Sequence, residues 1–229
     1  MKIIGITGYA QAGKDTLGKY IVENYGFTRY AFADALKKMA LALNPMIAKD
    51  TDFPPGTFEG WVRLVTLVQG PMPENKNGLG WEKAKQLPEV RRFLQVLGTE
   101  GARGTFGDNC WVDALKVKIE RDSSELIVIT DVRFPNEAEW IHSQGGKIIQ
   151  VQRINSDFTQ YDNGVSVTHP SEQHIATLPT DASIVSVTME GIYEQANLIL
   201  PGWGEGLHRP RPHLLDRGKF WTGHSEEEN

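Results

Sequence analysis

Residues 8–16, Gly8-Tyr-Ala-Gln-Ala-Gly13-Lys14-Asp15-Thr16, decide the fold because they lie between two segments of opposite character. The preceding residues 2–7 (KIIGIT) are β-branched and almost continuously apolar, which predicts a strand buried on both faces. Residues 14–25 carry apolar side chains at helical spacing and end before Gly26, which predicts a helix. A glycine-rich turn between such a strand and such a helix is typical of a phosphate-binding loop.

The chemistry of this loop follows from its backbone. Glycines let the N–H groups turn inward, and the start of the helix adds positive potential, so main-chain donors can hold a polyphosphate. Lys14 is expected to reach the transferred phosphoryl group and stabilise the charge that develops on it. The strict pattern has Ser or Thr directly after the lysine. Here Asp15 intervenes, so we expect Thr16 to bind phosphate and Asp15 to hold Mg²⁺ directly or through water.

A second group of polar residues follows another buried strand. Residues 125–130 (ELIVIT) lead to Asp131, and Arg133 comes two positions later. Ligands of open α/β sheets bind at the carboxyl ends of the strands. We therefore expect Asp131 to order Mg²⁺ through water or to accept from a substrate group. Arg133 is expected to bind a phosphate through its planar guanidinium. A simple ion pair between the two is the alternative.

The segment 88–103 predicts a long helix on which Arg92 and Gln95 share a face. Such a pair could bind a phosphate and the polar edge of a base. Taken alone, a solvated charged face is the simpler interpretation, and the same holds for Lys37 on the helix predicted over 34–43.

The order of elements predicts the fold class. Strands at 2–7, 28–32, 125–130, 147–152 and 182–187 alternate with helices, including those predicted over 109–121 and 135–144 and on both sides of the last strand within 171–200. This order indicates an α/β fold with a mostly parallel sheet of about five strands flanked by helices.

Two regions differ in composition from the rest of the chain. Residues 44–56 and 69–80 are rich in Pro, Gly, Asn and Asp and bracket an amphipathic stretch, 58–68. Residues 201–229 form a Gly/Pro/His-rich extension in which we expect no regular structure. A surface or docking arm is the expected role of this extension, and a metal site on His208, His213 and His224 is the weaker alternative.

Composition limits the possible partners. The net charge of −5 and the pI near 5.7 argue against a nucleic-acid or anionic-membrane binder. A single cysteine, Cys110, suits a reducing compartment. The first residues match neither a signal peptide nor an anchor, so we expect a cytoplasmic protein.

Four segments in this order resemble the phage-type deoxynucleoside monophosphate kinases, a branch of the P-loop nucleotide kinases. They are GYAQAGKDT (8–16), VRRFLQVLGTEGAR (90–103) followed by Trp111-Val-Asp, TDVRFPNEAE (130–139) and THPSE (168–172). The resemblance covers residues 1 to about 200. It implies Mg²⁺-dependent transfer of the γ-phosphoryl group of ATP to a deoxynucleoside 5′-monophosphate, on a P-loop NTPase fold. Residues 45–88 would be a helical, variable acceptor-binding insertion, and residues 153–170 a short lid.

The resemblance also implies site residues. ATP and its metal would be held by Gly8, Ala12, Gly13, Lys14, Asp15 and Thr16, with Arg153 as a lid arginine. Lys37 would lie near the acceptor phosphate, and Arg92, Gly98, Thr99 and Trp111 would line the deoxynucleotide pocket, with Trp111 stacking on the base or forming a wall beside it. Asp131, Arg133 and Glu137 would lie between donor and acceptor, and Gln95 is added because it shares a face with Arg92.

Of these residues, Lys14, Arg133 and Arg153 are the expected catalytic groups, and Asp15 and Asp131 the expected metal ligands. Kinases of this type are commonly dimers, so a homodimer is expected. Two alternatives remain at this point: a kinase of another small acceptor, such as dephospho-coenzyme A or a phosphorylated isoprenoid precursor, and a nucleotide-binding protein that transfers nothing. The variable insertion leaves the base preference open.

Overall fold

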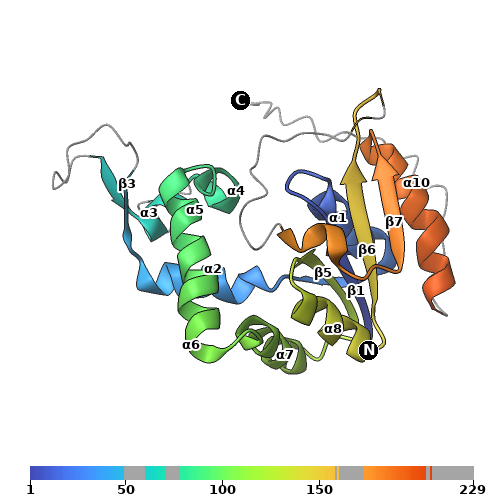
Figure 1. Cartoon of the computed structure of the whole chain (residues 1–229), viewed down its shortest axis with the longest axis horizontal. Coiled ribbons are helices and arrows are strands. Elements are labelled where there is room, and N and C mark those ends of the chain that lie inside the picture. Colours follow the sequence, from blue (N-terminus) through green and yellow to red (C-terminus); the bar gives the residue numbers. More distant parts are fainter. Residues whose placement is uncertain (49–59, 71–77, 158, 160–172, 205–206, 208–229) are drawn as a thin grey trace, which may run out of the picture.

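The computed structural model describes residues 1–48, 60–70, 78–157, 159, 173–204 and 207. Its centre is a five-stranded sheet in the order β2-β5-β1-β6-β7, with every neighbouring pair parallel (Figure 1). The strands are β1 (Lys2–Thr7), β2 (Thr28–Tyr30), β5 (Leu126–Val132), β6 (Lys147–Arg153) and β7 (Ala182–Ser186). The prediction of a five-stranded parallel sheet is confirmed.

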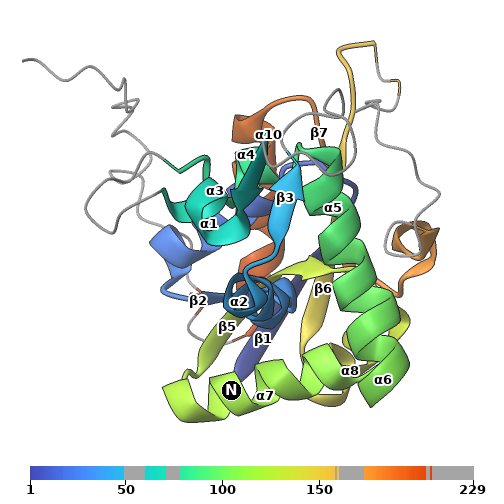
Figure 2. The same ribbon diagram turned by 90° about the vertical axis from the view of Figure 1, so that its left-hand side faces the viewer.

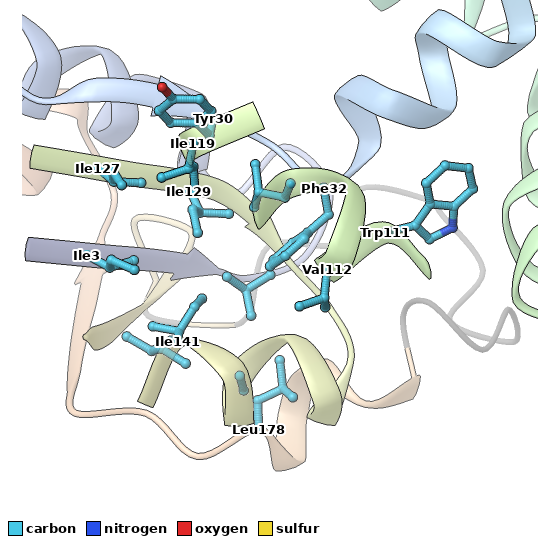
Figure 3. Packing of buried hydrophobic residues seen from close by; sticks show 14 of the residues in the cluster. Ile3, Tyr30, Phe32, Trp111, Val112, Ile119, Ile127, Ile129, Ile141 and Leu178 are labelled. Atoms are coloured by element: carbon cyan, nitrogen blue, oxygen red, sulfur yellow. The ribbon is translucent and has the colours of Figure 1, made fainter. Parts of the chain in front are cut away.

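Helices cover both faces of this sheet. On one face α1 (Lys14–Tyr25) and α10 (Met189–Ile199) bury a cluster that includes Ile6, Leu17 and Ile184. On the other face α7 (Cys110–Asp122), α8 (Pro135–Ser143) and the start of α2 (Ala33–Leu43) pack on Ile3 and Ile127. Figure 3 shows this second cluster, in which strand and helix side chains meet. Because helices cover both faces of the sheet, side chains on both sides of each strand are buried, which explains why the strand sequences are almost continuously apolar.

An insertion between α2 and α7 forms a separate body beside the sheet (Figures 1 and 2). It contains an antiparallel pair, β3 (Met46–Ala48) and β4 (Trp61–Arg63), followed by α3 (Leu64–Gln69), α4 (Gly80–Ala84) and α5 (Pro88–Gln95). These elements bury a third cluster, made of Ala40, Ile47, Leu64, Leu67, Val68, Ala84 and Val90. The sequence predicted a helical insertion, and the β3–β4 pair was not expected.

The helix predicted over 88–103 is regular only in its first half. It continues as a π-helix, η1 (Val96–Arg103), and a last turn, α6 (Gly104–Phe106). Gly98 packs so closely on α2 that a β-carbon there would lie 2.9 Å from Leu36 Cδ2. The glycines in η1 leave the backbone free to widen, and π-helical turns are frequent at functional sites.

Two more predictions of local structure need correction. In the described part of the region before β7, the expected helix is a single 3-10 turn, η2 (Ile175–Thr177). The segment after residue 200 begins with another 3-10 turn, η3 (Leu200–Trp203), although no regular structure was expected there. Pro201 fits because a proline in a first turn loses no hydrogen bond. Residues 160–170 of the predicted lid and all three histidines of the C-terminal extension lie outside the described residues. Among the described helices, none is long and apolar enough to cross a bilayer.

Candidate active site

The predicted phosphate loop lies at the carboxyl end of the central strand β1 and leads into α1. Gly8 and Gly13 have φ values of 145° and 99°, and Gln11 between them has a φ of 61°. A β-carbon at Gly8 would overlap the carbonyl oxygen of Val151, and one at Gly13 would lie 2.7 Å from Ile192 Cδ1. Gly8 is therefore required by backbone conformation and by space, whereas Gly13 is required chiefly by its backbone conformation, because the Ile192 methyl group could shift. Left-handed residues of this kind occur in loops whose N–H groups converge on an anion.

Lys14 is the first residue of α1 and is only 8% exposed. Its ammonium donates to the carbonyl oxygen of Tyr9 at 2.6 Å, so the charge lies against the loop. Ala12 is buried in the loop, while Asp15 is exposed and Thr16 half-buried in the first turn of α1. The loop and the helix start thus combine a cation, backbone donors and the positive end of a helix dipole.

Two buried threonines lie beside the loop. Thr7 ends β1 and Thr130 comes just before Asp131 on β5. Among the described residues, neither side-chain hydroxyl has a hydrogen-bond partner. Buried hydroxyls are normally paired with protein, water or an ion. The Thr130 side chain packs on Gly18 of α1, whereas Thr7 follows Ile6, which faces α1, and so lies on the opposite face of the sheet. The two hydroxyls therefore do not form one site.

Asp131 is the last residue but one of β5, and its side chain binds the start of α2. Its carboxylate oxygens accept hydrogen bonds from the backbone N–H groups of Phe32, at 2.8 Å, and Ala33, at 2.9 Å. The first N–H groups of a helix have no partner within the helix, so this carboxylate serves as the cap that α2 lacks. Asp131 therefore sets the position of α2 and of Lys37, one turn further along that helix.

Lys37 is half-buried between the sheet and the insertion. Burial lowers the pKa of its ammonium, and the positive charges of Lys85 and Arg29 lower it further, against the opposing effect of Asp34 and Asp131. Within the described ranges Lys37 forms no ion pair, and its ammonium lies 6.0 Å from the ring centre of Trp81. A desolvated cation among other cations is a favourable place for an anion.

Sequence reasoning missed Trp81, which lies in α4, and Lys85, which directly follows that helix. Their spacing of four residues would have suggested a shared helix face. No such signal links them to Lys37, more than forty residues earlier.

Glu137 is 3% exposed and fully engaged with the protein. Its carboxylate accepts from Arg103 Nη2 at 2.7 Å and from the backbone N–H groups of Arg133, at 2.8 Å, and Phe134, at 3.1 Å. Burial raises its pKa to about 7, helped by the negative charge of Asp131 and opposed by these donors. This packing corrects the expectation that Glu137 contacts substrate: its carboxylate organises the turn after β5. Arg103, its partner, was not among the expected site residues.

The residues expected to line the deoxynucleotide pocket are only partly brought together. Trp111 is 7% exposed and its indole N–H donates to the carbonyl oxygen of Gly98 at 2.9 Å. Trp111 thus belongs to the core and supports Gly98. Its ring is buried, whereas the resemblance implied that it would be open to a base. Gln95 and Thr99 are half-buried. The Arg92 guanidinium is exposed and binds Glu89 on its own helix, at 2.7 and 2.9 Å. This arrangement matches a solvated charged face, the simpler of the two interpretations of this helix.

Arg133 and Arg153 lie at the same edge of the sheet as the phosphate loop, after β5 and at the end of β6. Arg133 is half-buried and Arg153 exposed. In the described part of the chain, no group of three His, Cys, Asp or Glu side chains forms a metal cluster.

Comparison with known proteins agrees with this geometry. The family model of deoxynucleotide monophosphate kinase matches residues 75–194, more than half of the chain, although the phosphate loop lies outside the match. A putative deoxynucleotide monophosphate kinase of Acanthamoeba polyphaga mimivirus is 29% identical over 220 residues, covering 85% of this chain and 94% of its own length. The deoxynucleoside-5'-monophosphate kinase of Escherichia phage T5 is 25% identical, covering 76% and 84%.

Among solved structures, a dephospho-CoA kinase from Campylobacter jejuni aligns over 89% of this chain and 98% of its own, with 12% identity. Its TM-score of 0.42 is too low for any conclusion about the acceptor.

The family model, together with the phosphate loop and the strand-end carboxylate, leads to one assignment. The chain belongs to the deoxynucleotide monophosphate kinase family.

Proposed function

We propose that the protein transfers the γ-phosphoryl group of ATP to a deoxynucleoside 5′-monophosphate in a Mg²⁺-dependent reaction that yields the diphosphate and ADP. The observation that carries the proposal is the strand order β2-β5-β1. Asp131 lies near the end of β5, the strand between β1, which leads to the phosphate loop and Lys14, and β2, which leads to α2 and Lys37. Two separate cationic sites, one on each side of a carboxylate, suit a donor and an acceptor that are both anionic.

On the donor side, the loop from Gly8 through Ala12 to Gly13 would bind the ATP phosphates through backbone N–H groups. Lys14 and Thr16 would contact phosphate oxygens from the first turn of α1. Arg153 would close on the ATP side, with residues 153–170 acting as a lid. The buried, loop-bound position of Lys14 supports this part of the proposal, because a desolvated cation stabilises developing charge strongly.

Mg²⁺ would be held near Asp15 and Asp131. When bound, it neutralises phosphate charge and favours in-line transfer. Both oxygens of Asp131 already accept backbone hydrogen bonds from the start of α2. We therefore propose that Asp131 acts on the metal through water, while the exposed Asp15 is open to either mode. The unpartnered hydroxyl of Thr130, which lines the same pocket as Asp15, would accept or orient such waters.

On the acceptor side, Lys37 would bind the monophosphate, with Lys85 and Arg29 adding positive potential. The unpaired, half-buried state of Lys37 among described residues supports this role. Arg133 would bridge donor and acceptor. Gly98, Thr99, Gln95 and Arg92 would form the deoxynucleoside side of the cleft, with Trp111 holding Gly98 in place. Of these, Arg92 has the weakest support because its guanidinium binds Glu89.

Phosphoryl transfer asks little covalent chemistry of a protein, so alignment and exclusion of water supply most of the catalysis. The insertion and the predicted lid would enclose the substrates and suppress ATP hydrolysis. A homodimer, expected from the resemblance, stays a prediction that light scattering after gel filtration would check.

The test is an ADP-release assay with ATP and Mg²⁺ against dAMP, dGMP, dCMP, dTMP and dUMP, with AMP and dephospho-coenzyme A as controls. We expect turnover with one or several deoxynucleotides, and the distribution of turnover among them will identify the preferred base.

Lys14→Ala should abolish turnover with an unchanged circular dichroism spectrum, because the ammonium acts on the transferred group. The matched control is Lys19→Ala, since Lys19 is exposed on the same helix. Turnover with dephospho-coenzyme A alone, or ATP binding without any transfer, would replace the proposal by one of the two alternatives. Full activity of Lys14→Ala would refute the assignment of the loop.

A further inference from the structure

A buried set of contacts joins the end of the π-helix to the turn that carries Arg133. The guanidinium of Arg103 is 7% exposed and donates to Glu137 Oε1 at 2.7 Å and to the carbonyl oxygen of Asp108 at 2.7 Å. It also lies 3.9 Å from the ring centre of Phe134. One side chain thus binds α8, the loop before α7 and the turn after β5.

Glu137 passes this contact on to the backbone. Its second oxygen, Oε2, accepts from the N–H groups of both Arg133 and Phe134. Because the two carboxylate oxygens have separate partners, the Arg103 guanidinium and the Arg133 peptide are linked through a single rigid group. Charge-assisted hydrogen bonds of this length are the strong ones.

The other end of the link is the acceptor side of the molecule. Arg103 is the last residue of η1, which also contains Gly98 and Thr99. A shift of η1 would therefore be transmitted to the backbone at Arg133. The ring of His174, a few residues after the segment proposed as a lid, lies 5.9 Å from that of Phe134 between ring centres.

We propose that Arg103 is a positioning residue: through Glu137 it fixes the backbone from which Arg133 projects, and it couples that backbone to the η1 segment of the acceptor side. This inference rests on the proposed function, in which Arg133 acts on the phosphates. Arg103 itself touches no reacting group.

The chain offers a variant that breaks this link and keeps the hydrogen bonds of the turn. In Glu137→Gln the amide keeps the shape of the side chain, and its oxygen can still accept from the Arg133 and Phe134 N–H groups. Its NH₂ group then faces the Arg103 donor, so the contact with Arg103 is lost. We expect kcat to fall by about 10- to 100-fold, as for other supporting groups around active sites, with KM for ATP changed less than about twofold because the phosphate loop is untouched. Glu139→Gln, on the exposed side of α8, is the matched control and should behave as the wild type.

A double-mutant cycle separates positioning from general damage. In an Arg133→Lys background, which keeps a charge and measurable turnover, Glu137→Gln should lower kcat by less than about twofold, because the group that it positions is already altered. If Glu137→Gln costs the same factor in both backgrounds, or costs nothing in the wild type, the proposal is overturned.

A second readout does not depend on catalysis. Amide hydrogen exchange at Arg133 and Phe134 should be slow in the wild type, faster in Arg103→Met, and closer to the wild type in Arg103→Lys, which retains a charged donor. Unchanged protection of both amides in Arg103→Met would refute the link even if the enzyme proved to act on another acceptor. Conversely, the wild type could show no turnover with any monophosphate while the amides show the expected exchange pattern. That result would reject the proposed function and still support the contact between Arg103, Glu137 and the Arg133 backbone.

Discussion

Replacing Arg103 by methionine should destabilise the protein by an amount that depends on pH. The Arg103 and Glu137 side chains are 7% and 3% exposed and lie 2.7 Å apart. Removing one partner of a buried ion pair leaves the other charge uncompensated, which costs about 3–5 kcal/mol. In the wild type the pKa of Glu137 is already raised from 4.5 to about 7, chiefly by burial. Without Arg103 this pKa must rise further, because a favourable positive charge is lost.

The sign of the pH effect follows from this raised pKa. A carboxyl group whose pKa is higher in the folded state stabilises the fold below its unfolded pKa, and loses this contribution as pH rises through the folded pKa. At about 1.4 kcal/mol per pKa unit, the wild type loses about 3 kcal/mol between pH 4.5 and pH 7 from this group. The variant continues to lose stability above pH 7. The difference between the two proteins should therefore widen with pH.

Urea unfolding followed by circular dichroism at pH 6 and pH 8 would measure this difference. At pH 6 a larger fraction of Glu137 is protonated than at pH 8, so we expect a smaller cost for Arg103→Met there, about 1–2 kcal/mol for the lost hydrogen bonds. At pH 8 we expect about 3–5 kcal/mol. Arg121→Met, an exposed arginine at the end of α7, should stay within about 0.5 kcal/mol at both pH values. An equal loss at pH 6 and pH 8, or a loss below about 1 kcal/mol at pH 8, would refute this account of the pair.

Three further substitutions test the site. Gly8→Ala should weaken ATP binding measured by calorimetry, because its β-carbon would overlap the Val151 carbonyl oxygen, whereas Gly104→Ala, which meets open space, should leave binding unchanged. Asp131→Ala should cost about 1–2 kcal/mol of stability by uncapping α2, seen as a lower Tm, and should raise KM for the acceptor; an unchanged Tm would contradict the capping role. Lys37→Met should raise KM for the monophosphate by about tenfold or more with little change in KM for ATP. Lys38→Met, exposed on the same helix, is its control, and equal effects of the two would argue against a specific phosphate contact.

The sheet and its helices were predictable because the signals are local. Strand β1 and helix α1 begin and end as predicted, since a buried strand, a glycine turn and an amphipathic helix are each visible within a few residues. The sequence also placed Asp131 just after a strand, and the structure places it in the last two residues of β5, close to the predicted position. The partners of its carboxylate, the first N–H groups of α2, come from almost a hundred residues earlier and could not be predicted from spacing.

The parts of the site that depend on packing were less predictable. Arg103 and Glu137 are thirty-four residues apart, and no spacing pattern in the sequence pairs them. The resemblance placed Trp111 in the deoxynucleotide pocket. An aromatic side chain suits both a base and a core, and only the packing of η1 decides between them. The widened turn of η1 itself has no periodic signature, since glycine permits the widening without requiring it.

The insertion has its own hydrophobic centre, made by Ile47, Leu64 and Val90 with their neighbours, apart from the two clusters that hold the sheet. Substitutions in the insertion, or recombination at α2 and α5, can therefore change its sequence while the nucleotide-binding part of the chain keeps its stability. A chimaera that takes this body from a relative should fold and still bind ATP. Diversification of acceptor choice among such enzymes then becomes a matter of exchanging one independently packed part.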